Sequence, residues 1–161
     1  MTELERLYRC YAPDVYRFSY WLCGDAAEAD DLTSETFVRA WAGSGRVRAE
    51  SAKAYLLAIA RNLHRRHRRR ADRTVGLDPA LPDPSPRPDA NAESRSELAQ
   101  VVARLSELPE IDRSALLLRV EHELPYEEIA RVLEISVASA KVKVHRARLR
   151  LGKNERRGER G

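Results

Sequence analysis

The stretch PYEEIARVLEISVASAKVKVHRARLRL, residues 125–151, decides the fold class of this 161-residue chain. Pro125 suits the first turn of a short helix, because its missing N–H has no partner in that turn. A tight turn follows at residues 134–135, and Ser136 is a suitable N-cap for a longer helix that is rich in Lys and Arg. A short helix, a tight turn and a longer basic helix make up the order of a helix-turn-helix.

The longer helix separates its apolar side chains from its basic ones. Apolar residues recur at spacings of three and four and predict its core side: Val137, Ala140, Val144, Ala147 and Leu151. Cations flank that face on both sides, and Val142 lies on the outward strip between them. This arrangement is typical of a helix in the major groove, with cations toward the phosphates. A solvated basic surface is the alternative, which the preceding helix and turn make the weaker interpretation.

The rest of the chain also predicts helices, and no segment alternates as a strand does, so the expected fold class is all-α. Thr2, followed by Glu5, fits the start of a first helix that Pro13 is expected to break or kink. A second helix is expected to open at Asp25 and to stop at the glycines of residues 43–45, and a third opens near Ser51.

Five of the eight prolines fall between residues 79 and 88, in a segment without helical or strand periodicity. Such a segment reads as an extended linker between two small helical domains. The expected division is a first domain at 1–73, a Pro-rich linker at 74–93, a helix-turn-helix domain at 94–152 and a basic disordered tail at 153–161.

Charge is distributed unevenly, although the net charge is only +4. Acidic residues crowd at 25–35, whereas basic residues crowd at 61–73 and again from residue 141. Asp31, Glu35 and Val38 share one face of the expected second helix, with Asp30 and Ser34 beside it. Because an acidic face repels phosphate, we expect it to meet a protein partner; plain surface solubility is the alternative.

Several functional classes find no support in the sequence. Cys10 and Cys23 are too few to staple a fold of this size, so we expect reduced thiols in the core of a cytoplasmic protein. No apolar run is long enough to span a membrane, and the N-terminus lacks the pattern of a signal peptide. His64 and His67 stand among arginines and are expected to extend a basic face. We expect no metal, no cofactor and no enzymatic activity.

Two stretches carry a family resemblance. AEADDLTSETFVRAW at 27–41, followed by AKAYLLAIARNLHRRHRRR at 52–70, resembles region 2 of bacterial sigma factors, and residues 108–151 resemble region 4. With these two regions and a short linker, the chain resembles the extracytoplasmic-function (ECF) group of the sigma-70 family. The resemblance implies a subunit that gives RNA polymerase its promoter specificity.

The resemblance also implies partners and site residues. The acidic helix would bind the clamp helices of the largest polymerase subunit, and the flap region of the core and an anti-sigma protein are further implied partners. The polymerase-binding residues would be Asp30, Asp31, Ser34, Glu35 and Val38. The loop at 43–52 would hold a flipped base of the −10 element, supported by Arg61, Asn62, Arg65 and Arg66. The −35 element would be contacted by Ser139, Lys141, Val142, His145, Arg146 and Arg148.

The chain departs from the family pattern at several positions. Ser34 stands where Gln is common and Tyr55 where Trp is common. Glu134 replaces a Gly in the turn, which predicts backbone strain there. A stand-alone helix-turn-helix regulator, with the N-terminal bundle sensing or dimerising, is the alternative function that the residues themselves leave open.

Overall fold

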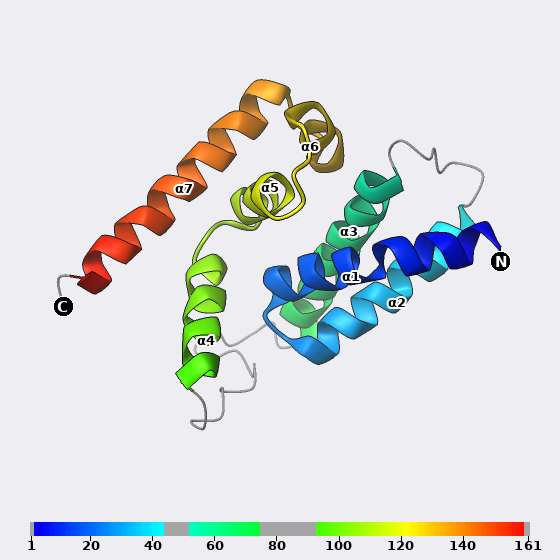
Figure 1. Cartoon of the computed structure of the whole chain (residues 1–161), viewed down its shortest axis with the longest axis horizontal. Helices are drawn as coiled ribbons and strands as arrows, with labels where there is room; N and C mark the ends of the chain where they lie inside the picture. The colour runs from blue at the N-terminus through cyan, green and yellow to red at the C-terminus, as the bar shows by residue number, and fades with distance from the viewer. Residues whose placement is uncertain (1, 44–51, 75–92, 160–161) are drawn as a thin grey trace. The chain divides into compact units, whose positions relative to one another are not determined.

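Seven helices and their connections account for the described part of the chain, residues 2–43, 52–74 and 93–159 of this computed structural model (Figure 1). All the regular structure within these ranges is helical, which confirms the all-α prediction. The chain divides into two compact units, residues 1–87 and 88–161. Nearly all of the expected linker, residues 75–92, lies outside the described residues.

The first unit packs α1 (Glu3–Cys23), α2 (Ala26–Ala42) and α3 (Ala52–Thr74) each against the other two. Its core contains the fully buried side chains Val15, Phe18, Leu32, Leu56 and Leu57. Burial of such side chains contributes roughly 1.5–3 kcal/mol each and holds the three helices together.

Local signals set the ends of α1 and α2. The Thr2 hydroxyl accepts a hydrogen bond from the Glu5 N–H at 3.2 Å, and the Asp25 carboxylate accepts from two N–H groups of the first turn of α2. Between the two helices Gly24 adopts a left-handed φ of 76°. Pro13, expected to break or kink this helix, does not end it, since α1 continues through Pro13 to Cys23. α3 begins at Ala52, close to the expected start; Ser51 itself lies outside the described residues.

The second unit contains α4 (Glu93–Ser106), α5 (Glu110–Val120), α6 (Tyr126–Leu133) and α7 (Val137–Glu159). α5 packs against α4, α6 and α7, and the helix-turn-helix consists of α6 and α7. Its core includes Leu118, Ile129 and Val144. α7 continues to Glu159, whereas the sequence predicted a disordered tail from residue 153.

Glu134 occupies the turn between α6 and α7 in the left-handed region, at φ 56° and ψ 47°. Its N–H closes α6 by hydrogen bonding to the carbonyls of Ala130 and Arg131. Ser136 then caps α7, because its hydroxyl accepts from the Ser139 N–H at 3.0 Å. The strain expected at Glu134 is therefore present, since a side chain disfavours this conformation.

Across the residues that the structure describes, no helix combines the length and the apolar character that a membrane span requires.

Candidate protein-docking and nucleic-acid interfaces

The acidic face of α2 is exposed along its length. All five side chains assigned to it from sequence are exposed: Asp30, Asp31, Ser34, Glu35 and Val38. The opposite face of α2 is buried in the core of the unit. The helix therefore offers three carboxylates and an apolar side chain to a partner while its other side holds the fold.

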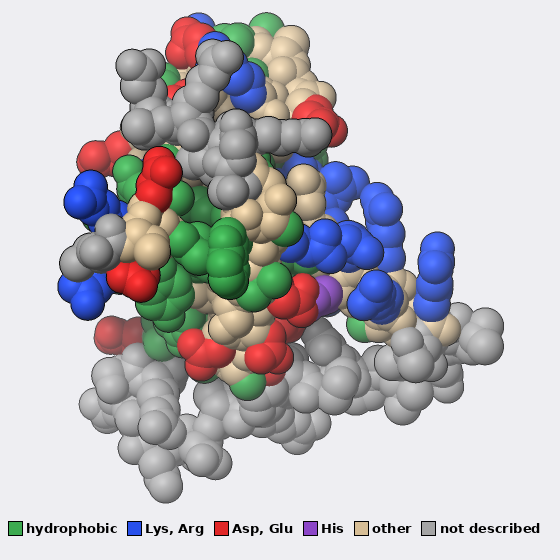
Figure 2. All heavy atoms as spheres, turned by 90° about the vertical axis from the view of Figure 1, so that its right-hand side faces the viewer, with side chains coloured by type: hydrophobic (Ala, Val, Ile, Leu, Met, Phe, Trp, Pro, Cys, Tyr) green, Lys and Arg blue, Asp and Glu red, His purple; other side chains and the backbone are tan. Residues whose placement is uncertain are grey.

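An apolar groove adjoins this acidic face. It lies between α1 and α2 and is lined by Leu4, Glu5, Tyr8, Arg9, Phe37, Val38 and Trp41. Tyr8 and Phe37 meet edge to face, with ring centroids 4.9 Å apart, while Val38 and Trp41 are about two-thirds exposed. Figure 2 shows one face of the molecule on which hydrophobic side chains gather beside acidic ones, with the largest group of Lys and Arg on the right. The sequence reasoning missed Trp41, although it follows Val38 by three residues, outside the buried stripe.

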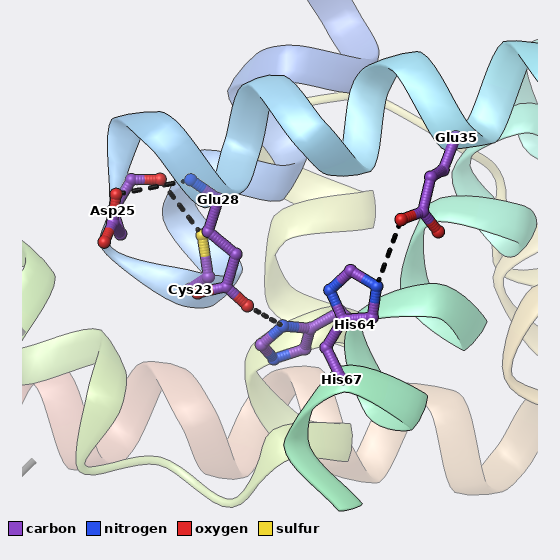
Figure 3. Close-up of polar contacts among 6 residues, drawn as sticks. All are labelled: Cys23, Asp25, Glu28, Glu35, His64 and His67. Atoms are coloured by element: carbon purple, nitrogen blue, oxygen red, sulfur yellow. Dashed lines mark hydrogen bonds and ion pairs between the residues drawn. The ribbon is translucent and has the colours of Figure 1, made fainter. Parts of the chain in front are cut away.

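Two histidines of α3 face glutamates of α2 (Figure 3). His67 Nε2 lies 3.5 Å from Glu35 Oε1, and His64 Nδ1 lies 3.9 Å from Glu28 Oε1. The prediction that His64 extends the basic face is wrong, because its side chain is only 1% exposed. It follows the buried Ala60 by four residues and so lies on the inner side of α3.

The outer side of α3 carries most of the cations. Asn62 and Arg66 are exposed and Arg65 is partly exposed, so all three can meet a nucleic acid. Arg61 is different: it lies four residues after the buried Leu57 and is itself only 3% exposed. The structure contradicts the assignment of Arg61 to DNA contact, since its side chain has almost no surface to offer a phosphate. Most of the predicted base-capturing loop, residues 44–51, lies outside the described residues.

α7 presents a basic surface opposite its core side. The predicted inner residues Ala140, Val144 and Ala147 are buried, and Val137 and Leu151 are partly buried. Most of the side chains assigned to the −35 element are exposed: Lys141, Val142, His145, Arg146 and Arg148. Ser139 is partly buried. The structure therefore brings these residues together on one helix, with Val142 58% exposed.

The Tyr126 ring lies close to cations from two other helices, Arg119 of α5 and Lys141 of α7. The ring lies 4.3 Å below the guanidinium carbon of Arg119, and the Lys141 ammonium is 5.7 Å from the same centroid. Cation–π contacts at these distances orient the two cations around the ring. Sequence reasoning missed this role, and the signal for it was an aromatic residue directly after Pro125.

Asp112 of α5 is a third residue that sequence reasoning missed. It is fully buried, and its two carboxylate oxygens accept hydrogen bonds from Arg146 Nε and Nη2, both at 2.8 Å. This carboxylate raises the pKa of the Arg146 guanidinium. The pair joins residues 34 positions apart, so no local pattern could have predicted it.

No group of three or more His, Cys, Asp and Glu side chains is placed to hold a metal ion in the described ranges. The exposed side chains form an acidic and apolar surface on α1 and α2 and basic surfaces on α3 and α7.

Each of the two units matches the model of a known protein family. Residues 7–74 match the model for sigma-70 region 2, and residues 98–151 match the model for sigma-70, region 4. The chain is 37% identical over 149 residues to the ECF RNA polymerase sigma factor SigC of Mycobacterium tuberculosis, covering 90% of this chain and 79% of that protein. It is 32% identical over 152 residues to SigM of Bacillus subtilis, covering 92% of each.

A solved structure has the same fold. The sigma factor RpoE of Bartonella quintana, solved in complex with the anti-sigma factor NepR, superposes with a TM-score of 0.77 at 23% sequence identity, over 95% of this chain and 96% of that one.

Proposed function

This chain belongs to the ECF group of the sigma-70 family and is a non-enzymatic sigma factor that directs promoter recognition and transcription initiation by RNA polymerase, and on that premise we propose which of its residues carry each task. The match of residues 7–74 to region 2 removes the basis for the alternative of a stand-alone regulator.

The exposed face of α2 docks on the clamp helices of the largest polymerase subunit. Asp30, Asp31 and Glu35 supply negative charge, and Val38 supplies apolar surface at the edge of the groove. Charges of this kind steer a complementary basic partner and set the register of the complex, while a buried apolar contact contributes most of the affinity.

Asn62, Arg65 and Arg66 of α3 capture the unpaired strand of the −10 element. Unstacking a base costs a few kcal/mol, and contacts to a captured base offset that cost. The amide of Asn62 can hydrogen-bond a base edge, whereas the two arginines meet phosphates. Arg61 is left out of this set because it is buried.

α7 reads the −35 element in the major groove. Lys141, Val142 and His145 face the base edges, and Ser139 lies beside them; Arg146 and Arg148 face the backbone. The observation that carries this proposal is the exposure of Val142 between cations, on the side of α7 opposite the buried Val144.

Two further partners follow from the same premise. We assign the flap region of polymerase to an apolar groove between α5 and α7. The groove is lined by Leu116, Leu117, Val120, Glu121, Arg148, Leu151 and Gly152. An anti-sigma protein that covers these faces is the other partner, by analogy with the complex of RpoE and NepR.

Transcription in vitro tests the proposal. Core polymerase reconstituted with this chain is given a library of genomic fragments, and the transcripts are sequenced. We expect start sites that share one −35 sequence and one −10 sequence at a fixed spacing. Start sites without a shared −35 sequence would contradict the role of α7, and palindromic footprints by the chain without polymerase would instead support regulation by the free protein.

A further inference from the structure

The pair of Asp112 and Arg146 has an unusual distribution of exposure. The Asp112 side chain is fully buried, whereas 47% of the Arg146 side chain is exposed. A carboxylate removed from water is strongly destabilising unless it is paired and hydrogen-bonded, and Arg146 supplies both through two bonds of 2.8 Å. The guanidinium thus lies between a buried anion and the open surface of α7.

The geometry of this pair leaves donors for a further ligand. A guanidinium has five N–H groups in one plane, and the bonds to Asp112 use one on Nε and one on Nη2. Three N–H groups remain: two on Nη1 and one on Nη2. Among the residues described here the structure gives these three no other partner. Arg146 follows the exposed Val142 by four residues, on the same side of α7.

The support behind Asp112 is rigid. The neighbouring Arg113 is 5% exposed and donates hydrogen bonds to three carbonyls at the end of α4 and just beyond it, those of Leu105, Ser106 and Leu108. The first turn of α5 is therefore tied to α4 on one side and to α7 on the other. A side chain anchored in this way loses its rotational freedom on folding and not when it binds DNA.

We propose that Asp112 is a positioning residue: it orients Arg146 so that the edge of the guanidinium with one N–H on Nη1 and one on Nη2 meets a backbone phosphate of the −35 element. This inference rests on the proposed role of α7. Because phosphate contacts fix the register of a helix in the groove, the pair serves sequence discrimination by aligning Lys141 and Val142 with the base edges. The buried charge of Asp112 stays behind the guanidinium, where a phosphate does not meet it.

The test is a double-mutant cycle on the holoenzyme, with Asp112→Asn, Arg146→Ala and the two combined. Affinity is measured for a promoter that the wild type selects and for the same fragment with a scrambled −35 sequence. We expect Arg146→Ala to weaken promoter binding about tenfold and to lower the salt slope by about one. Asp112→Asn is expected to reduce discrimination between the two fragments about fivefold, with the salt slope nearly unchanged. In the Arg146→Ala background it is expected to cause no further loss of discrimination.

Two controls separate orientation from folding. Arg146→Lys keeps the charge opposite Asp112 but cannot bridge two carboxylate oxygens and a phosphate, so we expect it to lose discrimination with little change in Tm. Asp14→Asn removes the surface ion pair between Asp14 and Arg17 in the other unit and is expected to leave discrimination unchanged.

Two outcomes would overturn the proposal. One is an unchanged affinity and salt slope in Arg146→Ala. The other is an equal effect of Asp112→Asn with and without Arg146, which would show that Asp112 acts only through the fold. If the wild-type holoenzyme itself does not distinguish the two fragments, the role of α7 fails as well; if it does and the cycle shows no coupling, only this inference fails.

Discussion

Glu35 of α2 and His67 of α3 face each other, with Oε1 3.5 Å from Nε2 (Figure 3). Glu35 is 48% exposed in its side chain and His67 is 26% exposed, so each retains surface for a partner. The residue that we assign to polymerase docking is therefore in direct contact with the helix that we assign to −10 capture. A substitution at either position has to be tested for effects on both tasks.

Reversal of the charge at Glu35 is expected to weaken polymerase binding. Glu35→Lys places a cation opposite the basic surface of the partner, which repels it. We expect at least a tenfold loss of affinity for core polymerase in a competition assay. Binding of the isolated chain to duplex DNA is expected to stay the same. His67→Gln, which removes the contact but keeps the acidic face, and Glu3→Lys on α1 serve as controls. Unchanged affinity in Glu35→Lys would remove Glu35 from the docking surface.

Removal of the Lys141 ammonium is expected to impair reading of the −35 element. We expect Lys141→Ala to lower transcription from a selected promoter about tenfold, with a loss of about one counterion from the salt dependence. Tyr126→Leu removes the contact of the same ammonium with the aromatic ring and is expected to lower transcription by a smaller factor. Arg150→Ala on the same helix is the control. A uniform loss across unrelated sequences would make Lys141 a backbone contact.

Arg61 and Arg66 form a matched pair for testing the exposure argument on α3. Arg61→Ala deletes a buried side chain and is expected to destabilise the fold by about 2–4 kcal/mol, measured by urea unfolding. Arg66→Ala is expected to leave stability unchanged and to lower the salt slope for a forked −10 template by about 0.7. Weakened template binding in a stably folded Arg61→Ala variant would restore Arg61 to the DNA site.

The left-handed turn at Glu134 predicts a stabilising substitution. Glycine adopts φ 56° without steric cost, so we expect Glu134→Gly to stabilise the chain by about 1 kcal/mol and to raise the Tm of the second unit by roughly 4–8 °C. Glu127→Gly, on the exposed side of α6, is expected to destabilise by a similar amount. A lower Tm in Glu134→Gly would show that the glutamate side chain contributes to the turn.

The two cysteines differ in exposure, and the structure corrects the expectation that both are core residues. Cys10 is exposed, while Cys23 is partly buried and donates a hydrogen bond from Sγ to the Asp25 carbonyl at 3.3 Å. Burial raises the pKa of the Cys23 thiol from 9.0 to about 11. At pH 8 we therefore expect iodoacetamide to modify Cys23 about a hundredfold more slowly than a free cysteine, by mass spectrometry.

The same shift has a consequence for stability. The pKa of the Cys23 thiol is higher in the folded chain than in the unfolded chain, so the neutral thiol stabilises the fold. This stabilisation is complete below pH 9 and is lost as the pH rises from 9.0 toward about 11. Cys23→Ser is expected to flatten the fall in Tm over this range. Rapid labelling of Cys23 in the native chain, at the rate of the urea-unfolded chain, would contradict the buried thiol.

Periodicity and capping residues were enough to predict the all-α fold, the start of α2 at Asp25, the Ser136 cap and the inner side of α7. These features depend on residues within one or two turns of each other, so the local sequence determines them. The exposure of the acidic face of α2 followed from the same patterns.

Only the tertiary structure decided which polar residues are hidden and which are paired. Arg61 and His64 stand in a run of cations that looks uniformly exposed, yet packing of α3 on its neighbours buries both. In the helix-turn-helix itself, local sequence placed Arg146 among the outward cations of α7. Its partner is 34 residues away on α5, because a pair of this kind forms only when two helices that each bury an apolar side are brought together by the core.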